Sequence, residues 1–210
     1  MKKCCFFLLL PMLLFSCTND FDESNEIKQE QPNVISNMTT NSVSINLSQI
    51  VTQLVATYPS VNGSNSYNTL SEKIILLKNV SSDNANFAEI ASDFSVPTEE
   101  EAKKFLVNYD QEYCDLKISS KVKNYFNSIL ELEYDPDLSD MLYSIITDDQ
   151  LTSNEKNLLI FTVDCLNDHN GNGDPNWKKR MIVASTSGFE VSSANAVFNV
   201  TLLNIIHMKL

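Results

Sequence analysis

The segment between Pro97 and Asn167 contains four successive patterns typical of amphipathic helices, which restricts the fold more than any other feature of the chain. In each pattern, apolar residues recur every three or four positions and therefore share one face of a helix. Two patterns begin with a capping box, in which a threonine and a glutamate three residues later satisfy unpaired amides of the first helical turn. These boxes are Thr98-x-x-Glu101 and Thr152-x-x-Glu155. Four such helices joined by short connections predict a mostly α-helical bundle.

The apolar faces of these four helices can be read from the sequence. They comprise Ala102, Phe105, Leu106, Tyr109 and Tyr113 in the first; Val122, Phe126, Ile129 and Leu130 in the second; Leu138, Met141, Leu142, Ile145 and Ile146 in the third; and Leu158, Leu159, Phe161, Val163 and Leu166 in the fourth. Ser120 begins the second helix, and Asp135-Pro136 supplies an N-cap and a first-turn proline to the third.

The segments on either side are less regular. Apolar residues from Leu47 to Val55 follow helical spacing and predict a helix that ends before Pro59. The apolar run from Ile74 to Leu77 fits either a buried helical turn or a short strand. At the C-terminal end we expect a helix from about Ser192 to His207. A strand through residues 198–206 is the alternative, because valine, threonine and isoleucine also suit sheets.

Length and charge narrow the class of protein. At 210 residues the chain is long enough for a single domain with its own core. It contains 15 Lys and Arg against 27 Asp and Glu, which gives a formal net charge of −12. Proteins that bind nucleic acids contact phosphates with clustered basic residues, and no such cluster is present. We therefore expect no nucleic-acid partner.

The N-terminus has the organisation of an export signal. Met1-Lys2-Lys3 is followed by an apolar stretch from Cys4 to Phe15, which only Pro11 interrupts, and then by the small residue Ser16. This stretch is much shorter than the roughly 20 residues that a helix needs to span a bilayer. We therefore expect a secretory signal peptide rather than a transmembrane anchor.

The sequence Leu14-Phe15-Ser16-Cys17 at the end of this signal resembles the lipobox of bacterial lipoproteins. The resemblance implies cleavage before Cys17 and acylation of that cysteine by a diacylglycerol and a further fatty acid such as palmitate. Thr18 stands where an aspartate retains such lipoproteins at the inner membrane, which implies a lipid anchor in the outer membrane, on a face that the sequence leaves open. Cleavage also removes two lysines, so the formal charge of the mature chain becomes −14.

This resemblance divides the chain into three parts. Residues 1–16 would form the signal peptide, and residues 17–46 a lipidated, flexible tether rich in polar and acidic residues. Residues 47–210 would form the helical domain.

One motif contains residues that could bind a metal ion. Asp168, Asn170 and Asn172 offer side-chain oxygens at alternate positions and a glycine follows them, as at the beginning of an EF-hand-like calcium loop. Lys179 stands where that loop requires a bidentate acid, so Asp168 and Asp174 supply the only formal charges. We expect calcium to bind weakly, with a dissociation constant of about 10⁻³ M, or not at all. The alternative is a plain turn, and no other cofactor is expected.

Two cysteines would remain in the mature domain besides Cys17. Cys114 and Cys165 either form a disulfide that ties the first helix of the bundle to the fourth, or pack as small hydrophobic side chains. The sequence leaves both alternatives open.

No catalytic motif stands out. His169 and His207 lie far apart in the sequence; we expect His169 in a solvated loop and His207 at the C-terminal surface. Motifs for a serine nucleophile, a metalloprotease or a phosphate loop are missing. Trp177 and the basic residues that follow it are expected to pack against the domain. We therefore expect a non-enzymatic binding or interaction module. The alternatives are a weakly calcium-binding or metal-dependent surface enzyme, and an antagonism factor that acts on membranes through its C-terminal apolar segment.

Overall fold

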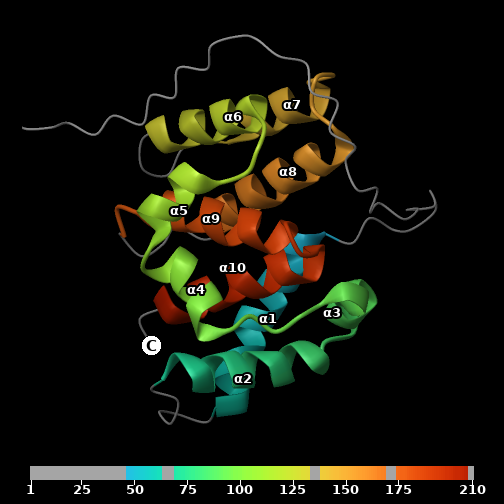
Figure 1. Cartoon of the computed structure of the whole chain (residues 1–210). Helices are drawn as coiled ribbons and strands as arrows, with labels where there is room; N and C mark the ends of the chain where they lie inside the picture. The colour runs from blue at the N-terminus through green and yellow to red at the C-terminus, as the bar shows by residue number, and fades with distance from the viewer. Residues whose placement is uncertain (1–45, 63–68, 133–137, 169–173, 208–210) are drawn as a thin grey trace, which may run out of the picture. The chain divides into compact units, whose positions relative to one another are not determined.

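The computed structural model describes residues 46–62, 69–132, 138–168 and 174–207, and every regular element within these ranges is helical (Figure 1). The predicted mostly α-helical bundle is therefore confirmed. The signal peptide (1–16) and the tether up to residue 45 lie outside the described residues. The elements are α1 (Leu47–Asn62), α2 (Leu70–Ser82), α3 (Ala85–Ile90), η1 (Ala91–Asp93), α4 (Glu99–Leu106), α5 (Tyr109–Asp115), α6 (Ser120–Glu131), α7 (Ser139–Thr147), α8 (Ser153–Asp168), α9 (Trp177–Phe189) and α10 (Ser193–His207).

The helices of the domain are stacked in successive layers (Figure 1). α6 contacts α8 and α9, and α7 contacts α8. α9 packs along α10, and α10 packs in turn against α1. α2, α3 and α4 cover the remaining sides of α10. This arrangement places α1 and α8, which lie far apart in the sequence, in direct contact.

Both predicted capping boxes are present. Thr98 Oγ1 accepts a hydrogen bond from the Glu101 amide at 3.2 Å, and the Thr98 amide donates to Glu101 Oε2 at 2.7 Å. Thr152 and Glu155 make the same two bonds at the start of α8, at 3.3 and 2.8 Å. Glu155 also accepts a hydrogen bond from Ser119, the N-cap of α6. These side chains therefore fix where α4, α6 and α8 begin.

A third capping box begins the helix that contains the run Ile74–Leu77, for which the sequence left helix and strand open. The Thr69 amide donates to Glu72 Oε2 at 3.0 Å, and Thr69 Oγ1 accepts from the Glu72 amide at 3.2 Å. The run belongs to helix α2, so the alternative of a short strand is wrong. Ile74 and Leu77 are buried while Ile75 is exposed, which is the spacing of a helix.

The first predicted bundle helix is in fact two helices, α4 and α5. The break lies at Val107 and Asn108, whose amides both donate to the Lys103 carbonyl, at 2.8 and 3.0 Å. This arrangement closes the last turn of α4 instead of continuing it. β-branched valine and asparagine, which bonds readily to nearby backbone, are both poor residues for a helix interior.

Two other boundaries differ from the sequence prediction. α1 continues to Asn62, so the expected end before Tyr58-Pro59 is wrong. A proline this close to the C-terminal end removes one backbone hydrogen bond without ending the helix. α7 begins at Ser139, with Leu138 as its N-cap. The predicted N-cap at Asp135-Pro136 lies outside the described residues.

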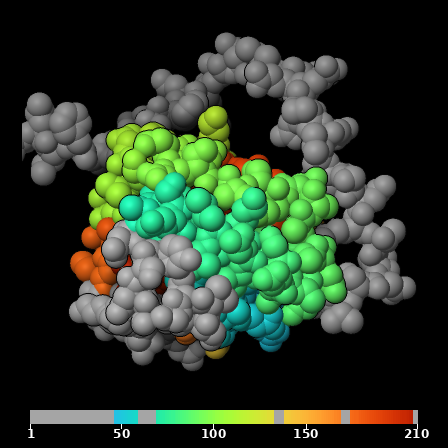
Figure 2. Space-filling view, turned by 90° about the horizontal axis from the view of Figure 1, so that it is seen from below, coloured from blue at the N-terminus to red at the C-terminus, as the bar shows by residue number. Residues whose placement is uncertain are grey.

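Helix α10 lies at the centre of the domain, which confirms the predicted C-terminal helix and makes the alternative of a strand wrong. Ser192 begins it, because Ser192 Oγ accepts a hydrogen bond from the Asn195 amide at 3.1 Å. The buried residues are Ala194, Asn195, Ala196, Val197, Phe198, Asn199, Val200, Thr201, Leu202, Leu203, Asn204 and Ile205. A helix buried on all sides has no polar face, which is why the sequence showed no amphipathic stripe here. In the view from below, α2 and the segments that follow it form much of the coloured surface (Figure 2), and α2, α3 and α4 contact α10.

α9 and α10 approach most closely where Gly188 meets Ala196. A Cβ atom on Gly188 would lie 2.2 Å from Ala196 Cα and 2.4 Å from Ala196 N, which is closer than non-bonded atoms can come. Both neighbouring atoms belong to the backbone and cannot rotate away. The Gly188 carbonyl also accepts the amides of Val191 and Ser192, each at 2.9 Å, and so closes the turn between the helices.

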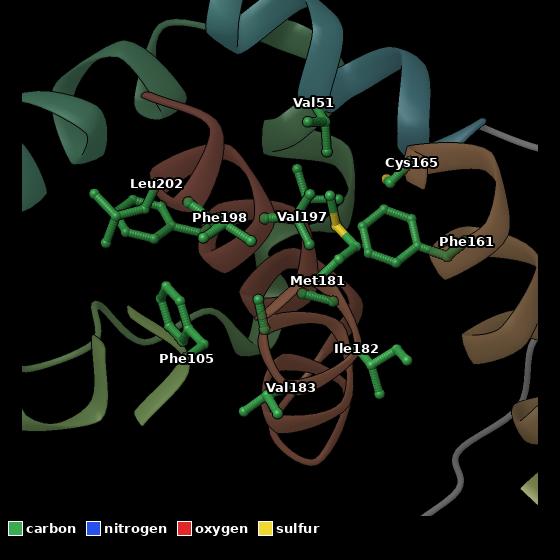
Figure 3. Packing of buried hydrophobic residues seen from close by; sticks show 14 of the residues in the cluster. Val51, Phe105, Phe161, Cys165, Met181, Ile182, Val183, Val197, Phe198 and Leu202 are labelled. Atoms are coloured by element: carbon green, nitrogen blue, oxygen red, sulfur yellow. The ribbon is translucent and has the colours of Figure 1, made fainter. Parts of the chain in front are cut away.

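Side chains from all ten α-helices of the described domain contribute to the core, and Figure 3 shows the part of it around α9 and α10. Phe198 of α10 is fully buried and its ring centroid lies 5.2 Å from that of Phe94, which in turn lies 5.1 Å from that of Phe87. On the other side of α10, Met181 and Phe161 point toward one another (Figure 3). Contacts between such large apolar side chains supply most of the burial that stabilises a domain of this size.

One buried polar side chain connects α10 to an extended segment of the chain. Asn195 Nδ2 donates to the Ser95 carbonyl at 2.6 Å, and Asn195 Oδ1 accepts from the Ser95 amide at 3.2 Å. The asparagine thus satisfies both backbone groups of Ser95, as a neighbouring strand would.

Among the described helices, none combines the length and apolarity needed to cross a bilayer.

Replacing Gly188 with alanine should destabilise the domain. Alanine favours a helix over glycine by about 1 kcal/mol, but the added Cβ would collide with the Ala196 backbone. We expect the free energy of unfolding to fall by about 1–3 kcal/mol, as for other overpacked cores. Urea denaturation should show a lower midpoint at an unchanged slope. The control Val191→Ala, at an exposed position of the same turn, should change the free energy by less than about 0.5 kcal/mol. Equal or greater stability of Gly188→Ala would contradict the close contact.

Candidate functional site

A groove of about 630 Å³ runs between the first turns of α1 and the last turns of α8. The α1 wall consists of Asn46, Ser48, Gln49, Thr52 and Gln53. The α8 wall consists of Asp164, Asn167 and Asp168. All of these described lining residues are polar, and none is basic or aromatic. The volume lies within the range of roughly 300–1,000 Å³ that is typical of small-molecule sites, although such sites usually have apolar walls.

The amphipathic pattern of α1 builds the first wall. Ile50, Val51 and Leu54 are buried in the core, so Gln49 and Gln53 face outward on the opposite side. Gln53 Oε1 accepts hydrogen bonds from Asn84 and Asn86 of the α3 region, at 3.3 and 3.1 Å.

The start of α1 is fixed by its own side chains. Asn46 Oδ1 accepts from the Ser48 amide at 3.1 Å and from Ser48 Oγ at 2.9 Å. Thr52 Oγ1 donates to the Ser48 carbonyl at 3.2 Å. The α1 wall is therefore an ordered row of amide and hydroxyl groups, because its side chains are held by bonds within the domain.

The α8 wall is negatively charged. Asp164 and Asp168 lie on the same side of α8 as the buried Phe161 and Cys165, at the edge of the core, where Asp164 is partly buried and Asp168 is exposed. Burial raises the pKa of the Asp164 carboxyl, and the nearby Asp168 carboxylate raises it further. Within the described residues, neither carboxylate forms an ion pair.

The groove offers hydrogen bonds and negative charge rather than a catalytic constellation. The Ser48 and Thr52 hydroxyls are bonded to Asn46 and to backbone, and no histidine, cysteine or lysine lies among the described lining residues. Over the described ranges, no group of three or more His, Cys, Asp or Glu side chains could hold a metal ion.

The structure separates the residues of the expected calcium loop. Asp168 lines the groove at the end of α8, whereas Asp174 Oδ2 lies 2.9 Å from Arg180 Nε in an ion pair. Asp174 Oδ1 also accepts the Asn176 amide at 2.9 Å, which forms a turn that leads into α9. Asn170 and Asn172 lie outside the described residues. Asp174 therefore already serves as the partner of a cation from its own domain.

His207, expected at the C-terminal surface, belongs to the same cluster, and its side chain is 23% exposed. Its Nδ1 lies 3.7 Å from Asp174 Oδ2, and its ring packs edge-on against Trp177, with centroids 5.6 Å apart. Burial lowers the pKa of His207 and the charge of Arg180 lowers it further, while Asp174 acts in the opposite direction. His169 lies outside the described residues.

Trp177 is buried, as expected for a packing role. The three basic residues that follow it form contacts with α5 and α6. Lys178 Nζ donates to the Leu132 carbonyl at 2.6 Å and so caps α6. Lys179 Nζ forms an ion pair with Asp110 of α5 at 2.6 Å. Arg180 lies over the ring of Tyr109, also in α5, 4.0 Å from its centroid.

The two cysteines of the domain differ in their surroundings. Cys165 is a free thiol, completely buried in α8, and burial raises its pKa well above the ordinary value. Cys114 is exposed on α5. The disulfide considered for this pair is therefore not present in the structure, and Cys165 instead packs as a small hydrophobic side chain.

Comparisons with known proteins found no relative of this chain. No protein-family model matches the chain, and neither the curated proteins nor the solved structures provide a significant match.

Of the groove residues, only Asp168 was singled out from the sequence. Gln49, Thr52 and Gln53 could have been recognised as the polar face of a helix, and Asp164 as an acid within an apolar stripe. Nothing in the sequence indicated that the first and eighth helices would face one another, because that contact depends on how both pack around α9 and α10.

The buried position of His207 predicts a stability that depends on pH. Because its pKa lies below the usual 6.5, the unfolded chain takes up a proton at a higher pH than the folded domain does. The free energy of unfolding should therefore fall as the pH decreases through about 6.5, and level off below the folded-state pKa. Urea denaturation between about pH 7.5 and about pH 5.5 should show a smaller decrease for His207→Gln than for the unmodified chain. The same decrease in both proteins would contradict this account of His207.

Proposed function

We propose that the protein is a lipoprotein anchored to the outer membrane through acylated Cys17, and that its helical domain is a non-enzymatic binding module. The observation that carries the binding role is the α1–α8 groove, whose described walls consist entirely of hydrogen-bonding side chains. The lipobox-like sequence at residues 14–17 supports the anchor. Residues 17–46 then connect the lipid to the domain, and the groove begins at Asn46, where that segment enters the domain.

The proposed anchor is strong enough to retain the protein at a membrane. A single acyl chain gives marginal binding, whereas a diacylglycerol with a further acyl chain contributes about 0.8 kcal/mol for each buried methylene group. The net charge of −14 expected for the mature chain is also unsuited to electrostatic binding at an anionic lipid surface, which attracts basic segments. Membrane attachment in this proposal therefore depends on the modified cysteine alone.

Two features favour a binding role over the alternatives considered from the sequence. The ion pair of Asp174 with Arg180 places a positive charge beside one of the carboxylates that a calcium site would need. The apolar character of α10, which suggested an action on membranes, is accounted for by its central position in the domain core. The α1–α8 groove, by contrast, lies at the surface between two helices, and all of its described lining residues can form hydrogen bonds with a ligand.

Labelling with palmitate tests the anchor. In a bacterial host that processes lipoproteins, the unmodified chain should incorporate labelled palmitate and fractionate with the outer membrane. Cys17→Ser should lose the label, because serine has no thiol to accept the diacylglycerol. The control Cys5→Ser should keep the label, because Cys5 leaves with the signal peptide.

The proposal fails if Cys17→Ser is labelled as well as the unmodified chain. It also fails if the unmodified chain is recovered unlabelled from the medium.

A further inference from the structure

We draw no further inference here: the strongest candidate, the exposed apolar face of α7 around Tyr143 and Ile146, carries no proposal because nothing in the described part of the structure shows what covers it.

Discussion

Burial of α10 from Ala194 to Ile205 is the constraint on which the rest of the domain depends. α10 contacts α9, α1, α2, α3 and α4, and its close approach to α9 requires the absence of a side chain at Gly188. Both walls of the groove depend on this arrangement, because α1 packs directly on α10 while α8 packs on α9 and α1. The position of the groove is therefore a consequence of the core, although no core residue lines it.

Asn195 in the core and the two carboxylates of the groove differ in whether they have a partner within the described domain. Asn195 is buried in α10 and satisfies both backbone groups of Ser95, which stabilises an irregular segment without a strand partner. Asp164 and Asp168 carry charges that no basic residue of the described domain compensates. The first arrangement contributes to the stability of the fold, whereas the second places two like charges four residues apart on one helix, a spacing at which they repel.

Local signals in the sequence were sufficient for most helices but not for their arrangement. The threonine and glutamate of each capping box act within one helical turn, so Thr98 and Thr152 predicted their helix starts correctly. α9 was not predicted because it is buried on most sides and lacks the polar face that periodicity detects. The Ile74–Leu77 run was left open between helix and strand because the exposed Ile75 interrupts the apolar stripe of α2. The groove and the Asp174–Arg180 ion pair join residues from separate elements or across a turn, and only tertiary packing brings such residues together.

Native-state hydrogen exchange tests the central role of α10 most directly. If the domain is organised around this helix, amides in the middle of α10, from Val197 to Leu203, should exchange only through global unfolding. Their opening free energy should then equal the free energy of unfolding measured with urea. Amides of α7, which packs on α8 and exposes Tyr143 and Ile146, should exchange much faster. Exchange of the α10 amides at the rate of those in α7 would contradict the account.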